Sequence, residues 1–421
     1  MAKSIRPQAA IADISSRNVS RRRSSDKTKS FGGRARRGRR SGATEERGEQ
    51  AREDSETPLI VRQNKTAVSG ADVERCPVCQ SAAIIKKGIR SKKHERVQLY
   101  WCKYCKRKFT AALTRFKTYP LRAVLDALTF YNRLHSLEET AERVKQCYGF
   151  AVRPETVRDW LADYREYLPF GRMREFIAKR YKPSEAVVET RLFHNQIYDF
   201  RYHRAKLACL LEDEFRNQKF APLKDFLELA LAECPHEVFR ESGLRASEHK
   251  NVFNLDGVRI VPKTNAAVRT AAMVLSAVAN RKLRHEVVQR FMLANDSVTV
   301  AAEVPVLLTP EDVRHLTHEL NFTVPLDIEK PVTGHIDLLQ VRNGMIHILD
   351  FKPNAKRARP VDQLMLYALA LSRLTTLRLF HMKCAWFDGE SYFEFFPLHV
   401  VYKRQKRIRR KVVAKALVQP V

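Results

Sequence analysis

Residues 332–352 read VTGHIDLLQVRNGMIHILDFK, and they predict two β-strands joined by a tight turn. Apolar residues fill both halves, and the Asn343-Gly344 dipeptide between them is typical of two-residue hairpin turns. Asp337 lies in the first strand and Asp350 near the end of the second, so neighbouring strands hold two carboxylates side by side at a sheet edge. Paired carboxylates in an apolar setting repel each other unless a cation lies between them. The pattern therefore predicts a metal site.

Lys352 adds a cation to this pair. It follows Asp350 by two residues, so its side chain points to the same face of the strand. Hard oxygen ligands favour Mg²⁺ or Mn²⁺, and such a metal beside a lysine can hydrolyse a phosphodiester. Glu303, in the upstream strand VAAEVPV, is a further acid that completes the set. The alternative is that both aspartates are polar residues at strand ends and that Lys352 is a surface charge.

The flanking residues predict an α/β domain over residues 261–402. VTVAAEVPVLL, which ends at Leu308, reads as a further strand, and VDQLMLYALALSRL reads as an amphipathic helix. CAWFDGESYFEFF predicts a hairpin that turns at Asp388-Gly389.

The charge of the chain indicates a polyanionic partner. Its 421 residues carry a formal net charge of +30, with a pI near 10.0. No apolar run is long enough to span a bilayer, and the N-terminus lacks the apolar stretch of a signal peptide. We therefore predict DNA rather than a membrane as the partner, and a cytoplasmic, nucleoid-associated location.

Both ends of the chain are basic. Residues 1–70 are rich in Ser, Arg and Gly and poor in large apolar residues, so they predict a disordered arm that contacts phosphates. A solvated tail without a partner is the alternative. Residues 403–421 predict a second basic tail.

Two CxxC pairs within residues 71–115 predict a small zinc ribbon. The insert between them alternates apolar and basic residues, as a β-hairpin does. Each pair places two thiolates on one tight turn, and two turns complete a closed, structural Zn²⁺ site. The predicted ligands are Cys76, Cys79, Cys102 and Cys105. Unrelated buried cysteines are the alternative, and a redox role is disfavoured because two matching pairs flank one ribbon.

Residues 116–170 predict three helices arranged as a helix-turn-helix. The first begins at Pro120, the second follows a capping box of Ser136 and Glu139, and the third begins near Pro154. The third would be the recognition helix, with its N-terminal residues nearest the base edges. The candidate DNA contacts are Arg153, Glu155, Thr156 and Arg158. An ordinary helical hairpin with solvated charges is the alternative.

These two segments resemble the front end of insertion-sequence transposases. The resemblance lies in CPVC, YWCKYCKRKFT, SLEETAERV and RPETVRDWL. It implies DNA binding in a mobile-element setting. The RNase H-type catalytic domain that usually follows has no convincing counterpart here.

The C-terminal motifs resemble the PD-(D/E)xK nuclease superfamily, specifically its RecB-like branch. The family pattern is a Glu strand, then GxxD, DxK and QxxxY, and it is matched in order by Glu303, Gly334 with Asp337, Asp350 with Lys352, and Gln363 with Tyr367. The resemblance implies that both aspartates bind metal, that the lysine is catalytic and that the Glu supports them. It also implies that the Gln and Tyr, one helical turn apart, face the site or the DNA backbone.

The family often carries a His ligand on an early helix, and His285 is the best-placed candidate. An ordinary packed histidine is the alternative there, and we expect His335 and His347 to be structural. Some RecB-like enzymes hold an iron–sulfur cluster with one early and three late cysteines. Only Cys384 follows the QxxxY helix, so no cluster is expected. The remaining cysteines, Cys147, Cys209, Cys234 and Cys384, are predicted to be buried thiols.

The chain is therefore predicted to be multidomain. The predicted order is a disordered basic arm (1–70), a zinc ribbon (71–115), an all-α helix-turn-helix (116–170), a helical connector (171–260), a restriction-endonuclease-like α/β nuclease core (261–402) and a basic tail (403–421). The predicted function is DNA binding with Mg²⁺- or Mn²⁺-dependent phosphodiester hydrolysis, in a mobile element or genome defence. The alternatives are a sequence-specific DNA-binding regulator with an inactive nuclease fold and a transposase-related recombinase. A homodimer is compatible with each of these functions.

Overall fold

The computed structural model describes residues 73, 75–110, 118–213, 215–241, 244–250, 252–256, 258–278 and 280–402. The predicted basic arm and basic tail lie outside the described residues. Among the helices that are described, none combines the length and apolarity needed to cross a membrane.

A small antiparallel sheet contains the cysteine pairs. Its strands, in the order β1-β2-β3, are β1 (Ile84–Ser91), β2 (Arg96–Cys102) and β3 (Lys108–Phe109). The hairpin predicted between the two CxxC pairs is therefore present. Its interior is small, because the buried cluster that the described residues form there consists of Cys76, Tyr100, Cys102 and Phe109.

The three helices predicted after the ribbon are also present: α2 (Leu121–Asn132), α3 (Leu137–Tyr148) and α4 (Pro154–Asp163). The predicted capping box starts α3, because the Ser136 side chain accepts from the Glu139 amide at 3.1 Å and Glu139 accepts from the Ser136 amide at 2.8 Å. Their apolar sides share one core with α10 (Ala266–Ser276) and α11 (Arg284–Asn295). A buried hydrogen bond of 2.8 Å from Asn132 to Asn295 joins α2 to α11.

The predicted helical connector needs correction. Residues 171–260 contain the helices α5 (Gly171–Ala178), α6 (Pro183–Ala186), α7 (Arg204–Asp213), α8 (Ala221–Ala232) and α9 (His236–Glu241), but also strands β4 (Val188–His194), β5 (Gln196–Tyr202) and β6 (Leu244–Arg245). β4 and β5 form a hairpin, and β5 pairs antiparallel with β8 (Thr299–Leu308). The pairing with a strand about a hundred residues away decides this structure, and local sequence does not show it.

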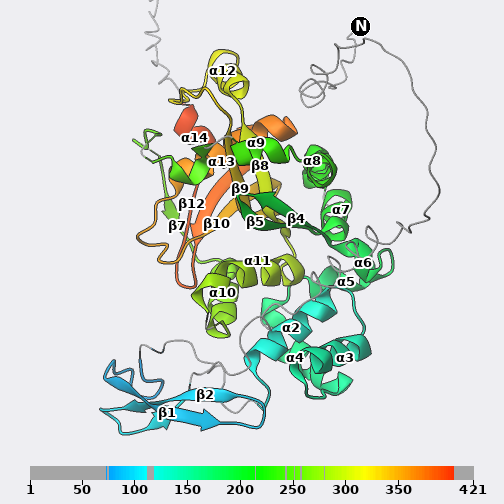
Figure 1. Cartoon of the computed structure of the whole chain (residues 1–421), viewed down its shortest axis with the longest axis vertical. Helices are drawn as coiled ribbons and strands as arrows, with labels where there is room; N and C mark the ends of the chain where they lie inside the picture. Colours follow the sequence, from blue (N-terminus) through cyan, green and yellow to red (C-terminus); the bar gives the residue numbers. More distant parts are fainter. Residues whose placement is uncertain are drawn as a thin grey trace, which may run out of the picture. The chain divides into compact units, whose positions relative to one another are not determined.

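One large mixed sheet organises the rest of the described chain (Figure 1). Its order is β4-β5-β8-β9-β10-β11-β12-β7, with β6 paired to β9. The strands not yet bounded are β7 (Val261–Pro262), β9 (Val332–Arg342), β10 (Met345–Phe351), β11 (Met382–Phe387) and β12 (Tyr392–Phe395). The remaining helices are α12 (Pro310–His318), α13 (Val361–Thr375) and α14 (Leu398–Val401).

The centre of this sheet follows the chain order α11, β8, β9, β10, α13, β11. Its first three strands are antiparallel, and α13 then crosses over so that β11 lies parallel to β10. The predicted turn joins β9 to β10, with φ of 53° at Asn343 and 67° at Gly344. The predicted hairpin of β11 and β12 is confirmed, with Asp388 accepting the amide of Ser391 in its turn at 2.7 Å.

A buried lysine ties the connector to this core. Lys206 in α7 is fully enclosed, and its Nζ donates to the carbonyl oxygens of Leu293 and Asp296 at 2.5 Å and of Thr299 at 2.9 Å. Three acceptors match the three N–H donors of an ammonium group. Burial nevertheless lowers the pKa of this lysine to about 7. The contact fixes the connection between α11 and β8.

Helix α13 was predicted to be amphipathic, but it is buried on nearly every side. It packs against β8, β9, β10 and β11, and its Tyr367 ring lies against Gly334 of β9. A Cβ at position 334 would lie 2.4 Å from Cε1 of Tyr367. Only glycine therefore allows the helix to approach the strand this closely.

We expect Gly334→Ala to lower the free energy of unfolding by about 1–3 kcal/mol, because the added methyl group overpacks the contact with Tyr367. Urea denaturation of the full chain measures this. Gly171→Ala is the matched control, since a Cβ there meets no atom within 4 Å. Equal unfolding midpoints for the two variants would contradict the packing argument.

Candidate active site and zinc centre

The register of β9 and β10 brings the two predicted aspartates together. Leu338 pairs with Leu349 across these antiparallel strands, so the next position places Asp337 opposite Asp350. Both carboxyl groups are buried, with 7% and 1% of the residue surface exposed. Two acidic side chains are thus held side by side with almost no water around them.

Glu303 joins them from β8. Its neighbour Ala302 pairs with Leu338, so Glu303 lies opposite Asp337. Its φ of 53° is left-handed, and the strand changes face there: Ala302 packs in the core with α11, whereas Val304 packs in the core with α13. A regular strand would send both residues to one face. The irregular backbone therefore redirects the Glu303 side chain.

Two contacts hold Asp337. Its Oδ2 accepts from the Phe351 amide at 2.8 Å and lies 2.5 Å from Nε2 of His285 in α11. Burial alone would raise the pKa of Asp337, but His285 and Lys352 outweigh it and the net shift is downward. For His285, burial opposes protonation, yet the Asp337 carboxylate raises its pKa to about 9. The imidazolium and the carboxylate therefore form an ion pair at neutral pH.

Asp350 is less well compensated. Its Oδ2 lies 3.0 Å from Nζ of Lys352, but no backbone amide or hydroxyl group of the described residues donates to either carboxylate oxygen. Burial and the negative charge of Asp337 raise the pKa of Asp350 to about 8. An enclosed carboxylate with unused lone pairs is where a cation would bind.

The acidic residues fit a divalent metal. Asp337, Asp350 and Glu303 offer hard oxygen donors on three adjacent strands, the ligand type that Mg²⁺ and Mn²⁺ prefer. Burial and Asp337 raise the pKa of Glu303 to about 7, so this carboxylate too is held close to a strong like charge. His285 could add a nitrogen donor after losing its proton.

Gln363 and Tyr367 lie on α13, the helix that packs against the three strands with the acidic residues. Gln363 Nε2 donates to the tyrosine hydroxyl at 2.8 Å. Burial and the nearby Asp350 carboxylate raise the pKa of Tyr367, so its hydroxyl stays neutral. The four ordered motifs found in the sequence thus lie at one place.

The four ribbon cysteines form a second cluster. Their sulfurs lie within 4.8 Å of one another, including Cys76 to Cys105 at 3.6 Å and Cys79 to Cys102 at 3.5 Å. Both turns have the same form, because Gln80 and Lys106 each follow the second cysteine with φ of 59°. Amide hydrogen bonds overcome the effect of burial and lower the pKa of Cys76 to about 7. This set fits tetrahedral Zn²⁺.

The predicted DNA contacts all lie at the start of α4. Arg153, Glu155 and Arg158 are exposed and Thr156 is half-buried. They are therefore accessible to a partner, as a recognition helix requires.

Sequence reasoning missed two sets of residues. Gln289, one turn after His285 on α11, donates to Glu303 Oε1 at 2.7 Å, and the i, i+4 spacing was a usable signal. The second set gathers around Cys234, which is half-buried next to His194. Of the other predicted thiols, Cys209 and Cys384 are buried and Cys147 is half-buried.

One comparison with known proteins found a family model that matches part of the chain. The family model of the PD-(D/E)XK nuclease superfamily matches residues 249–400. Members of this superfamily are typically nucleases that use divalent metals, and the matched residues include all four motifs of the acidic site. Searches of curated proteins and of solved structures found no match.

We expect Asp350→Asn to stabilise the metal-free protein. The folded pKa of Asp350 lies near 8, above its ordinary value of 3.8, so the charge costs stability increasingly as pH rises from about 4 and in full above 8. At pH 9 in chelator, the variant should gain about 1–3 kcal/mol in urea unfolding.

Mg²⁺ provides the second arm of this experiment. It should raise the unfolding midpoint of the wild type by mass action but not that of Asp350→Asn. Glu311→Gln, at a carboxylate that is 86% exposed, is the control and should change neither value. A destabilised Asp350→Asn at high pH would show that the carboxylate is already satisfied without metal.

Proposed function

We propose that the chain is a DNA-binding, divalent-metal-dependent nuclease that hydrolyses phosphodiester bonds. The observation that supports this best is the enclosed pair Asp337 and Asp350, in which the Asp350 carboxylate is compensated by the single ammonium group of Lys352 at 3.0 Å and by no backbone amide of the described residues. The match of this region to a nuclease family agrees with it.

Each residue of the site has a role in this proposal. Asp337, Asp350 and Glu303 would hold the metal, which when bound lowers the pKa of a water molecule and polarises the scissile phosphate. The pKa of Lys352 is raised, because Asp350 and Asp337 outweigh the effect of burial, so its Nζ stays protonated and can stabilise charge that develops on the phosphate. Glu303, oriented by Gln289, would add a further carboxylate oxygen to the metal.

Basic residues flank the site on two elements. The loop after β10 carries Lys356, Arg357 and Arg359, all exposed, within seven residues of Lys352. Arg281 and Lys282, also exposed, precede His285 at the start of α11. Cations on both sides of an acidic metal site suit a backbone with regularly spaced phosphates.

The positive charge of the chain is unevenly distributed. Residues 71–115 contain twelve Lys and Arg against three Asp and Glu, whereas residues 116–170 contain eight of each. The ribbon rather than the three helices would therefore supply non-specific affinity for phosphates, and α4 would read bases.

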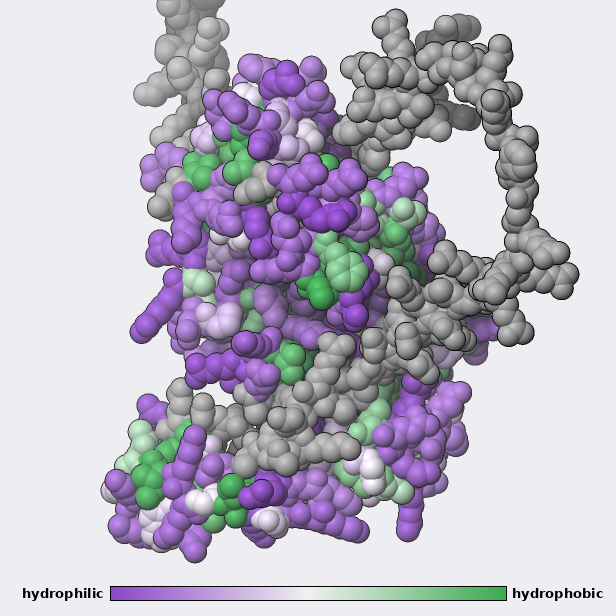
Figure 2. Space-filling model, viewed as in Figure 1, coloured by the Kyte–Doolittle hydropathy of each residue, from purple (hydrophilic) through white to green (hydrophobic). Residues whose placement is uncertain are grey.

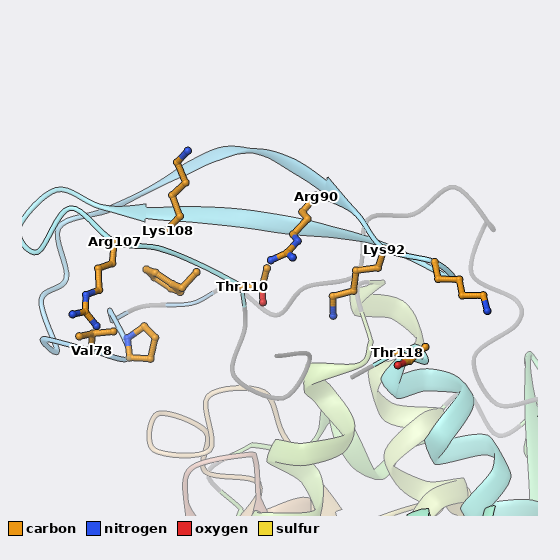
Figure 3. A pocket seen from close by; sticks show the side chains of 10 residues that line it. Val78, Arg90, Lys92, Arg107, Lys108, Thr110 and Thr118 are labelled. Atoms are coloured by element: carbon orange, nitrogen blue, oxygen red, sulfur yellow. The ribbon is translucent and has the colours of Figure 1, made fainter. Parts of the chain in front are cut away.

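Among the residues that Figure 2 colours, hydrophilic ones cover most of the face shown. A pocket on the ribbon is lined by basic side chains from its strands and loops, of which Arg90, Lys92, Arg107 and Lys108 are labelled in Figure 3. Such a pocket can accept a phosphate group.

The finer assignment is also a proposal. We infer a RecB-like nuclease joined to a transposase-like zinc ribbon and helix-turn-helix, bound to DNA in the nucleoid and serving a mobile element or genome defence. The order of the motifs Glu, GxxD, DxK and QxxxY and the pairing of two CxxC turns with three helices support it. The competing function is a DNA-binding regulator whose nuclease fold is inactive.

The first prediction concerns cleavage of linear and circular plasmid DNA with Mg²⁺ or Mn²⁺. The wild type should cut, and chelator should stop it. Asp350→Ala should abolish cutting because a metal ligand is lost, and Lys352→Ala should slow it at least about 100-fold because it removes a charge-stabilising group. Gel analysis of time courses measures the rates.

Lys356→Ala is the matched control, because it removes an exposed lysine from the same loop. It should change the rate only a few-fold. DNA binding without cutting, in both metals and on both forms of the plasmid, would overturn the nuclease proposal in favour of the regulator.

The second prediction separates non-specific affinity for DNA phosphates from recognition of the base sequence. Arg90→Ala with Lys108→Ala in the ribbon should weaken binding to every DNA sequence and reduce the slope of log affinity against log salt by about 0.9 per lost phosphate contact. Arg153→Ala with Arg158→Ala in α4 should instead reduce the preference between sequences. Fluorescence anisotropy across a salt series measures both effects.

Arg172→Ala with Lys179→Ala, at two exposed basic residues in and directly after α5, controls for the loss of two positive charges. Unchanged sequence preference in the α4 variant would remove the recognition role of that helix. An unchanged salt slope in the ribbon variant would remove the role of the ribbon.

A further inference from the structure

A cluster of nitrogen and sulfur donors lies outside both sites described above. It contains His194 at the end of β4, Cys234 in the turn between α8 and α9, and His236 at the start of α9. One potential ligand atom from each of the three residues lies within 4.8 Å of the others. They are separated by up to 42 residues in sequence, so the fold and not local spacing brings them together.

The central histidine is held firmly. His194 is 3% exposed, and the Phe239 ring stacks on it at 4.2 Å between centroids. Its Nδ1 lies 2.9 Å from Nε2 of His335, which is itself stacked under Tyr198 at 3.6 Å. The ring orientation is therefore fixed by Phe239 and His335, and Nε2 is directed toward His236 and Cys234.

The distances suit a tetrahedral metal. His194 Nε2 lies 2.8 Å from His236 Nδ1 and 3.8 Å from Cys234 Sγ. Bonds of about 2.0–2.1 Å to nitrogen and 2.3 Å to sulfur give tetrahedral edges of roughly 3.4–3.6 Å. The sulfur lies about 0.2 Å beyond such an edge, and the two nitrogens need to separate by about half an ångström. Two pairs of ribbon sulfurs, Cys76 with Cys105 and Cys79 with Cys102, are 3.6 and 3.5 Å apart.

We propose that His194, Cys234 and His236 form a second zinc site, with His335 as the residue that positions His194. Two imidazoles and a thiolate are ligands for Zn²⁺, not for the hard cation of the acidic site. The bond between His194 Nδ1 and His335 matches the usual support of a metal-bound histidine, whose second nitrogen donates to a neighbour.

The site has an open side. Cys234 is half-buried and His236 is exposed, so the fourth position faces solvent. Zinc there would join the β4–β5 hairpin to the α8–α9 turn and to the start of α9, the helix whose Arg240 carbonyl accepts from Asn195 of the hairpin at 3.3 Å. Through His335 it would also brace β9 two residues before Asp337. The metal thus stabilises the part of the sheet that precedes the matched family region.

Metal analysis of the full chain tests this proposal. After dialysis against metal-free buffer, the wild type should retain about two zinc ions per chain, one in the ribbon and one here. Cys234→Ser and His236→Asn should each retain about one. Cys76→Ser with Cys79→Ser should also retain about one, and combining it with Cys234→Ser should leave none.

Cobalt provides an independent readout. The variant Cys76→Ser with Cys79→Ser, loaded with Co²⁺, should show the charge-transfer band of a single thiolate. Adding Cys234→Ser to this variant should remove that band. Cys147→Ser, at another half-buried cysteine, and His318→Asn, at another exposed histidine, are the matched controls and should keep two zinc ions. Circular dichroism confirms that each variant is folded.

A different zinc count would overturn the second zinc site. One zinc ion in the wild type that disappears entirely with the ribbon cysteines, together with unchanged zinc content in Cys234→Ser and His236→Asn, would reduce the cluster to hydrogen-bonded imidazoles. Because zinc is counted directly, this result is independent of whether the chain cuts DNA.

Discussion

The two-residue turn at Asn343 and Gly344 controls the site, because it sets the register between β9 and β10. Side chains alternate between the faces of a strand, so a slip by one residue would separate Asp337 from Asp350 and send them to opposite faces. The same register brings the Phe351 amide to Asp337. It also ends β10 so that Lys352 follows within reach of Asp350. The positions of Asp337, Asp350 and Lys352 thus depend on a turn that contributes no side chain to the site.

The fold holds these charges against their mutual repulsion. Asp337 is compensated by His285 and an amide, whereas Asp350 has one lysine at the edge of an otherwise apolar surrounding. The repulsion between these charges lowers the stability of the fold, and the large core around α13 offsets this loss. The left-handed backbone at Glu303 is a second local strain in the same three strands. The poorly compensated charge of Asp350 and the left-handed backbone at Glu303 both favour a site that binds a cation over a more stable site that binds none.

The sequence predicted what is local and patterned. The turn, the strands around Asp337 and Asp350, the capping box of α3 and the paired cysteine turns all lie where short-range chemistry placed them. It did not predict β4, an edge strand with Glu189 and Arg191 among few apolar residues, because pairing across the sheet decides its structure. The contact of His194 with Cys234, the left-handed Glu303 and the burial of α13 are also non-local. The roles of the site residues and the domain boundaries stay predictions.

The ammonium group of Lys206 has a consequence for where this protein can be divided. The carbonyl oxygens of Leu293, Asp296 and Thr299 depend on a donor that comes from outside residues 249–400. The hairpin that covers the open edge of β8 also comes from outside that span. A fragment cut at the family boundary would expose three orphaned acceptors and a bare strand edge, which invites aggregation. The region that matches the family model is therefore not an exchangeable cassette, and recombination between genes would succeed only upstream of the β4–β5 hairpin.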